Sequence, residues 1–388
     1  MKKIIKLTYN VFIFTFIILN FAVFNNVINF ANAVAAEENL TTARGMAVME
    51  VSTGRLLYTK NENEQLPMAS TTKIITAIVA IENNNDLSKI IEIEKDMTGI
   101  EGTSIYLKAG EHLSIEELLY GLMLRSGNDA AVSIAKATSG SVNAFVDLMN
   151  EFCKRIGANN TQITNPHGLP DDNHYTTARD LATISCYAMK NEKFANLVGT
   201  RQKTISNELN SVKKRILNNK NKLLKNMDNS TGIKTGFTKK AGRCFVGSAE
   251  KDGMEVVCVL LNCAPMFEEC QSLLEKAFSE YKLVEVIKND EIVGETKIIG
   301  GEKESVKVTT KTGAVVPLKV SEVDSVQTIF DFVKEINAPH DSSDAIGKFD
   351  IYASNNLIFS GKLYIIETAN IRPKSFGEDI IKDFLHVG

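Results

Sequence analysis

The chain contains no tryptophan, only 7 prolines among 388 residues, and no long run of like charge or internal repeat. Scarce proline together with ordinary glycine argues against a disordered or low-complexity protein. The 44 basic and 47 acidic residues leave a formal net charge of −3, so no basic surface points to nucleic acid. With 44% hydrophobic residues, the chain can form one large core or, more readily, two domains.

Cysteine patterns are also missing. No CxxC pair occurs, and the spacing matches no metal site. In a chain this long, six cysteines do not indicate a disulfide framework, and we expect mostly buried free thiols. The cysteines are Cys153, Cys186, Cys244, Cys258, Cys263 and Cys270.

The N-terminus has the pattern of a secretory signal peptide. Lysines at the start precede an apolar stretch from Val11 to Phe24 and a small-residue site, Ala31-Asn32-Ala33. The stretch is short for a membrane span, which disfavours a retained anchor. We therefore expect residues 1–33 to be removed on export, although cleavage after Ala35 or Ala36 fits equally well.

Residues 41–282 mix helical and extended patterns. This predicts an α/β domain with an antiparallel sheet and flanking helices. A capping box, Ser114-Ile115-Glu116-Glu117, marks the start of one helix. The other expected elements are a hairpin at 44–59, helices at 71–81, 129–137, 142–156, 177–189 and 267–281, and strands at 233–238, 242–249 and 254–261.

Residues 283–373 show short alternating stretches between Gly and Asp/Asn turns, which predicts a small β-rich domain. Only 325–336 has a helical pattern. In the tail, 374–388, apolar residues gather on one face of a short amphipathic helix. Contact with a membrane surface and packing on the β-rich domain are both compatible with this tail.

A nucleophile motif, SxxK, starts at Ser70 and ends at Lys73. A serine on the first turn of a helix shares its face with a lysine three residues later, which can accept the hydroxyl proton if its amine is neutral. The motif alone is weak evidence, because SxxK also starts at Ser133, Ser211, Ser248 and Ser279.

Order and context single out Ser70. Ser126-Gly127-Asn128 follows between two predicted helices, and Lys234-Thr235-Gly236 follows in a predicted strand. Further SxN copies at Ser141 and Ser354, and a KTG copy at Lys311, lack this ordered context. SxxK, SxN and KTG together are the signature of β-lactamases and penicillin-binding proteins.

Residues 41–282 resemble the D-alanyl-D-alanine carboxypeptidases among the low-molecular-mass penicillin-binding proteins. Three stretches narrow the resemblance to that group: Pro67 to Lys73, Asn165 to Leu169 with His174 to Ala178, and Lys234 to Thr238. The β-rich region resembles the second domain of the same proteins. The resemblance implies a β-lactamase/transpeptidase-like catalytic domain and an exported, extracytoplasmic enzyme at the cell wall or the outer face of the membrane.

The resemblance also implies roles. Ser70 is the nucleophile, Lys73 the general base and Ser126 a proton relay to the leaving D-alanine. Backbone N–H groups of Ser70 and Phe237 form the oxyanion hole. The residues implied to bind substrate are Asn128, Lys234, Thr235, Gly236 and Phe237. The expected partners are D-Ala-D-Ala peptides of peptidoglycan and penicillin-type inhibitors, with no cofactor and no nucleic acid.

Alternative functions remain open. A class A β-lactamase shares the trio but uses a glutamate to clear the acyl-enzyme, and the loop Asn165 to Asp172 has none. A DD-endopeptidase that cuts cross-links breaks a similar bond, and a non-catalytic penicillin-binding sensor would keep the fold. A metal site at His167, His174, Asp171 and Asp172 is disfavoured, because the spacing fits no zinc motif of peptidases.

Overall fold

A computed structural model describes residues 40–205 and 214–372, and these form two compact units. The first extends to Lys276 and the second begins at Ala277, apart from Asp252–Met254, which groups with the second. The predicted signal peptide and the amphipathic tail lie outside the described residues. Among the described residues, no helix is long and apolar enough to cross a membrane.

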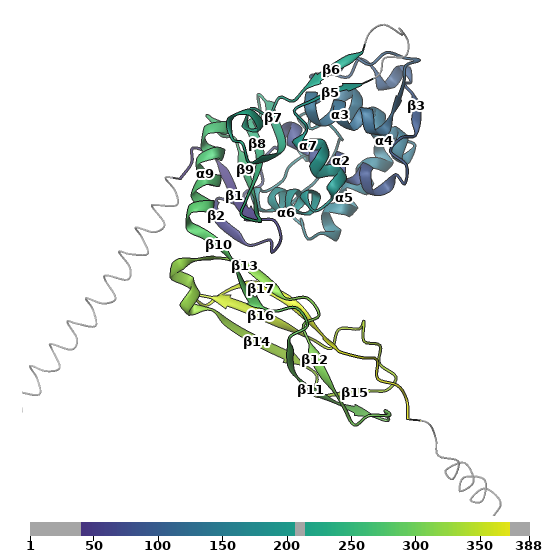
Figure 1. Cartoon of the computed structure of the whole chain (residues 1–388). Coiled ribbons are helices and arrows are strands. Elements are labelled where there is room, and N and C mark those ends of the chain that lie inside the picture. Colours follow the sequence, from purple (N-terminus) through teal and green to yellow (C-terminus); the bar gives the residue numbers. More distant parts are fainter. Residues whose placement is uncertain (1–39, 206–213, 373–388) are drawn as a thin grey trace, which may run out of the picture. The chain divides into compact units, whose positions relative to one another are not determined.

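The first unit is built on a five-stranded antiparallel sheet in the order β2-β1-β9-β8-β7, in which β7 is an edge strand. Its central strand, β9, is almost wholly apolar and buried, as expected for a strand covered on both faces. Helix α9, Met266–Glu280, lies along one side of the sheet, and most of the other helices lie on the opposite side (Figure 1). The strands are β1 Gly45–Glu50, β2 Leu56–Lys60, β7 Ser230–Thr238, β8 Gly242–Lys251 and β9 Met254–Leu261.

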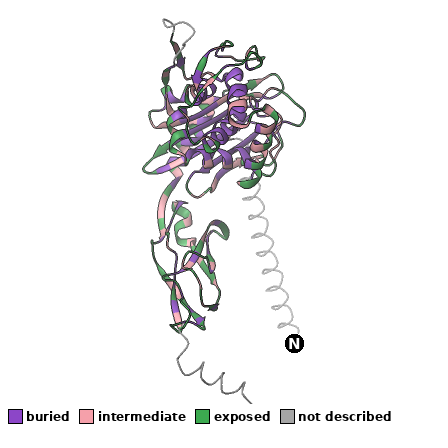
Figure 2. Cartoon of the chain, turned by 90° about the vertical axis from the view of Figure 1, so that its right-hand side faces the viewer, coloured by how far each residue is buried: buried purple, intermediate pink, exposed green. Residues whose placement is uncertain are grey.

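Helix α2, Lys73–Asn83, runs through the core of this unit, and its residues from Lys73 to Ile81 are all buried. Such a helix is apolar on every side because neighbours surround it (Figure 2). The 3₁₀ turn η1, Ala69–Thr72, leads into it. The remaining helices are α3 Ile115–Arg125, α4 Asn128–Ser139, α5 Val142–Arg155, α6 Ala178–Met189, α7 Glu192–Gly199 and α8 Leu223–Asn226.

Most of the expected elements of this unit are confirmed, with helix and strand limits that differ by a few residues. The predicted capping box at Ser114 is present: its hydroxyl accepts from the Glu117 N–H, and the Glu117 carboxylate accepts from the Ser114 N–H. All six cysteines are buried and unpaired. The sequence did not predict several short elements. They are helices α7 and α8, the turn η2 Lys95–Met97, and two antiparallel strand pairs. The first pair is β3 Ile90–Glu92 with β4 His112–Ser114, and the second is β5 Gln202–Ile205 with β6 Arg215–Asn218.

The second unit is β-rich, as predicted, and has a core of its own around Val308, Phe349 and Leu363. A six-stranded sheet has the order β14-β16-β17-β12-β11-β15, and β10 pairs separately with β13. The bounds are β10 Tyr281–Ile287, β11 Ile292–Ile299, β12 Ser305–Thr309, β13 Ala314–Lys319, η3 Val320–Ser325, β14 Gln327–Phe332, β15 Glu335–Asn337, β16 Gly347–Ala353 and β17 Asn356–Ile365.

The helix predicted at 325–336 is wrong. This segment forms the edge strand β14 and the short strand β15, and β14 pairs with β16 from Gln327 to Phe332. Thr328, Ile329 and Phe330 are residues that favour strands. The spacing of apolar residues imitates a helical face, but backbone pairing with β16 determines the conformation.

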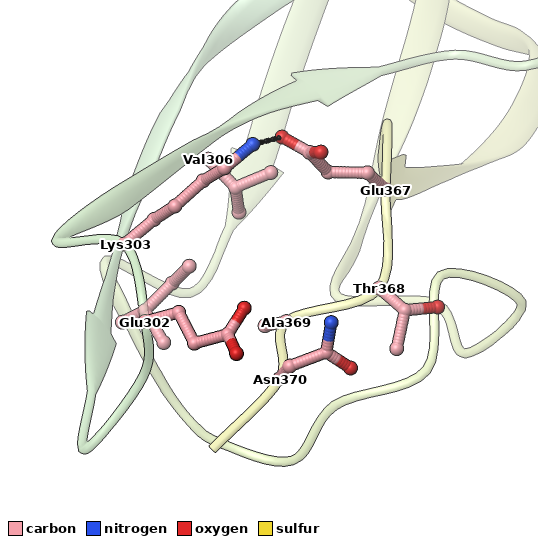
Figure 3. Close-up of a pocket in the computed structure, with 8 residues that line it drawn as sticks. Glu302, Lys303, Val306, Glu367, Thr368, Ala369 and Asn370 are labelled. Atoms are coloured by element: carbon pink, nitrogen blue, oxygen red, sulfur yellow. Dashed lines mark hydrogen bonds and ion pairs between the residues drawn. The ribbon is translucent and has the colours of Figure 1, made fainter. Parts of the chain in front are cut away.

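A small pocket of about 130 Å³ lies in the second unit, lined by residues of the β11–β12 turn and of the chain after β17. Figure 3 shows Lys303 pointing to Glu367 across it, and these two side chains form an ion pair. The positive charge of this pocket is therefore already compensated.

Candidate active site

Ser70 lies in the turn η1, and Lys73 is the first residue of α2. The turn brings the two side chains together: the Lys73 Nζ is 3.0 Å from the Ser70 Oγ. The residue before the serine, Ala69, has a φ of 49°, a left-handed conformation that is uncommon for alanine. Backbone strain of this kind is held in place by the surrounding structure, which here fixes the approach of Ser70 to Lys73.

The Lys73 amine has three neighbours. Besides Ser70, it lies 2.7 Å from the Asn128 Oδ1 and 2.6 Å from the backbone oxygen of His167. Both of these are carbonyl oxygens and can only accept. They take up the two N–H groups of a neutral amine, which leaves its lone pair for the third neighbour, the Ser70 hydroxyl.

The electrostatic surroundings favour that neutral form. Lys73 is fully buried, and loss of hydration lowers its pKa well below the usual range, with further lowering by the charges of Lys234 and Lys220. Asp129 acts in the opposite direction, but its effect is the weakest of the four.

The second motif lies at the junction of α3 and α4. Ser126 ends α3 with a left-handed φ of 65°, and Asn128 begins α4. Asp129 holds this junction to the loop before it: its buried carboxylate accepts from the Ser104 hydroxyl and from the N–H groups of Ile105 and Leu107. The loop and the motif therefore keep a fixed spacing.

The third motif lies on the edge strand β7. Lys234 is buried, and its Nζ donates to the Thr235 backbone oxygen at 2.9 Å. Burial, assisted by the charge of Lys220, lowers the pKa of Lys234 to about 7. A Cβ on Gly236 would lie 3.0 Å from the Ser70 nitrogen and 3.1 Å from the Thr71 nitrogen, so a larger residue would have to push the strand and Ser70 apart by a few tenths of an ångström.

The two histidines have structural contacts. His174 accepts from the Thr164 N–H through Nδ1, which places the ring proton on Nε2, where it donates to the Thr72 hydroxyl at 2.8 Å. Burial lowers the pKa of His174 to about 4 and that of His167 to about 3. Neither ring is therefore charged at neutral pH. Within residues 40–205 and 214–372, no group of three or more His, Cys, Asp or Glu side chains could hold a metal ion.

Two protein families match this chain, one over each of its two parts. The family model for D-alanyl-D-alanine carboxypeptidase matches residues 32–264, and the model for the C-terminal domain of penicillin-binding protein 5 matches residues 281–370. The chain belongs to the D-alanyl-D-alanine carboxypeptidase family. The carboxypeptidase resemblance and the fold class expected from the sequence are thereby confirmed.

Individual carboxypeptidases agree with this assignment. The D-alanyl-D-alanine carboxypeptidase DacF of Bacillus subtilis is 31% identical over 79% of this chain and 80% of its own length. DacC of Escherichia coli is 27% identical over 86% of this chain and 87% of its own. Penicillin binding protein 5 from Haemophilus influenzae superposes with a TM-score of 0.73 at 26% identity, covering 85% of this chain and 98% of that one.

In this carboxypeptidase a cleft of about 280 Å³ contains Ser70, Ser126 and the Thr235–Phe237 segment. Three other copies of the motifs within the described residues lie elsewhere: Ser133 is within α4, Ser248 within β8, and Lys311 in the second unit. Sequence reasoning missed other lining residues, Thr103, Lys220, Arg243, Met266 and Phe267. It also missed the backbone oxygen of His167, because any residue supplies such an acceptor and no sequence signal marks it.

Proposed function

We propose that this carboxypeptidase cleaves the terminal D-alanine from peptides ending in D-Ala-D-Ala through an acyl-enzyme on Ser70. The observation that carries the proposal is the environment of Lys73: a buried amine with two acceptor-only neighbours and the Ser70 hydroxyl as the third. A lysine kept neutral in this way can accept the serine proton as attack begins.

In the acylation step, the Ser70 Oγ bonds to the carbonyl carbon of the penultimate D-alanine while its proton passes to Lys73. The negative charge on the carbonyl oxygen is stabilised by the N–H groups of Ser70 and Phe237, and one such donor contributes about 3 kcal/mol. The C–N bond then breaks, and the Ser126 hydroxyl relays a proton to the departing D-alanine amine. Water hydrolyses the ester and releases the shortened peptide.

Substrate binding uses the residues around this point. Lys234 and the Thr235 hydroxyl bind the terminal carboxylate, supported by Lys220, which lines the same cleft. Asn128 holds the substrate amide and accepts from Lys73 at the same time. Gly236 keeps β7 beside the nucleophile, so that the substrate can lie along the free edge of this strand.

The location follows from the substrate. Members of this family act on peptidoglycan peptides outside the cytoplasm and bind β-lactams. We propose that residues 1–33 direct export, that 41–282 carry the catalysis, and that 374–388 contact the membrane surface. The loop Asn165 to Asp172 contains no glutamate to direct water, so the penicillin adduct on Ser70 should be long-lived rather than rapidly hydrolysed.

The test is release of D-alanine from a blocked peptide ending in D-Ala-D-Ala. Ser70→Ala should lower kcat about 10⁶-fold, as loss of a nucleophile does in serine peptidases, while circular dichroism shows the same fold. Equal D-alanine release by the variant and the wild type would refute the assignment. Hydrolysis of the cross-link in peptide dimers at a higher kcat/KM than release of D-alanine from linear peptides would favour the endopeptidase.

A further inference from the structure

Arg243 has no role in the proposed reaction, yet it lines the same cleft as Ser70. It lies on β8 directly opposite Phe237 in the register of the β7–β8 pair. The two side chains are in contact, with the guanidinium carbon 5.8 Å from the centre of the Phe237 ring. A ring beneath a guanidinium limits its freedom and leaves its N–H groups available to an anion.

This cation has no acidic partner among the described residues, in contrast to two other exposed cations of the chain. On the same hairpin, Lys240 forms an ion pair with Asp172. In the pocket of the second unit, Lys303 is paired with Glu367 (Figure 3). Arg243 and Phe237 are both exposed, the ring by 62%, so a bound peptide can reach both.

The position along β7 indicates which part of the substrate passes Arg243. The proposed carboxylate site begins at Lys234 and Thr235, and the reacting carbonyl lies at Ser70 and Phe237. Two residues of a strand span about 7 Å, so Arg243, opposite Phe237, lies beyond the carboxylate site on the acyl side of the cleaved bond. The substrate residue before the two D-alanines lies on that side.

We propose that Arg243, supported by Phe237, selects substrates that carry an anionic side chain on the residue preceding D-Ala-D-Ala. A guanidinium binds a carboxylate through two parallel hydrogen bonds, which a neutral carboxamide cannot match. The inference rests on the proposed function, since it uses the same cleft and the same peptide direction.

The experiment compares two peptides that differ only in charge. Both end in D-Ala-D-Ala and have a blocked N-terminus, and the preceding residue is L-α-aminoadipic acid or its side-chain carboxamide. Partly exposed ion pairs of this kind contribute modestly, so the full-length enzyme should prefer the acid about fivefold in kcat/KM, mainly through KM. Arg243→Gln should reduce that ratio to about 1, and Arg243→Lys should retain part of it.

Lys239→Gln is the matched control, because Lys239 is an exposed cation of the same hairpin that does not line the cleft. It should leave the ratio unchanged. An unchanged ratio in Arg243→Gln would overturn the inference. If kcat/KM fell equally for both peptides, the ratio would likewise be unchanged, and Arg243 would then bind the terminal carboxylate that both peptides share. Failure of the wild type to release D-alanine from either peptide would instead refute the proposed function.

Discussion

The protonation states of two lysines, Lys73 and Lys234, determine what this cleft can do. Both are buried, and neither forms an ion pair with an acidic side chain among the described residues. Removing an ammonium from water is costly, so burial lowers both pKa values. The proposed mechanism requires the two to differ: Lys73 accepts a proton, whereas Lys234 must keep its charge to attract the substrate carboxylate.

Because Lys234 must stay charged to bind the carboxylate, its titration should make KM depend on pH. Burial lowers the pKa of Lys234 to about 7. As pH rises through 7, the ammonium of the free enzyme loses its proton and its attraction for a carboxylate that stays ionised. KM for a peptide ending in D-Ala-D-Ala should therefore rise steadily above about pH 7. Steady-state kinetics between pH 6 and 9 measures this change.

A peptide that ends in D-alaninamide serves as the control, because it carries no terminal carboxylate. Its KM should change little over the same range. If the KM values of the two peptides follow the same pH curve, Lys234 is not the carboxylate-binding charge.

At the level of elements, the site depends on close contact between η1 and the loop that contains Gly168. A Cβ on Gly168 would lie 2.0 Å from the Ala69 backbone oxygen and 2.9 Å from the Thr72 Oγ1. Its φ of +85° also favours glycine. The same loop supplies the His167 oxygen to Lys73, so the contact couples the loop to the side chains of Ser70 and Lys73.

Gly168→Ala should therefore push the loop away from Ser70 and lower kcat/KM about 100-fold, the cost of a displacement near 1 Å. Gly54→Ala is the matched control, because Gly54 also has a positive φ, +71°, but no atom within 4 Å of its Cβ position. It should cost about 1 kcal/mol of stability and leave kinetics unchanged. Equal kinetic effects of the two variants would contradict the close-contact account.

The elements most accurately predicted are those with a local signal. The apolar run after Ser70, the capping box at Ser114 and the turn at Lys251 to Gly253 give the positions of helices and strands directly. The sequence did not predict what depends on distant partners. Residues 327–332 form a strand through pairing with β16, and Lys220 and Arg243 line the cleft only because the chain folds back on itself.

At the level of the whole molecule, the two units have separate hydrophobic cores, one around Ile78 and Leu122 and the other around Val308 and Phe349. The residues of the proposed site all come from the first unit. Domains with their own cores can unfold independently.

Differential scanning calorimetry should therefore show two transitions. Acylation by penicillin stabilises only the unit that holds Ser70, so only one transition should move to higher temperature, and neither should move in Ser70→Ala. A single transition, or an equal shift of both, would contradict this description.

The central claim is that Ser70, of the five serines in SxxK motifs, is the nucleophile. The most direct test is mass spectrometry of the protein after penicillin treatment and proteolysis. The account predicts one covalent adduct, on the peptide that contains Ser70, and its disappearance in Ser70→Ala. An adduct on a peptide containing Ser133, Ser211, Ser248 or Ser279, or one that persists in Ser70→Ala, would contradict it.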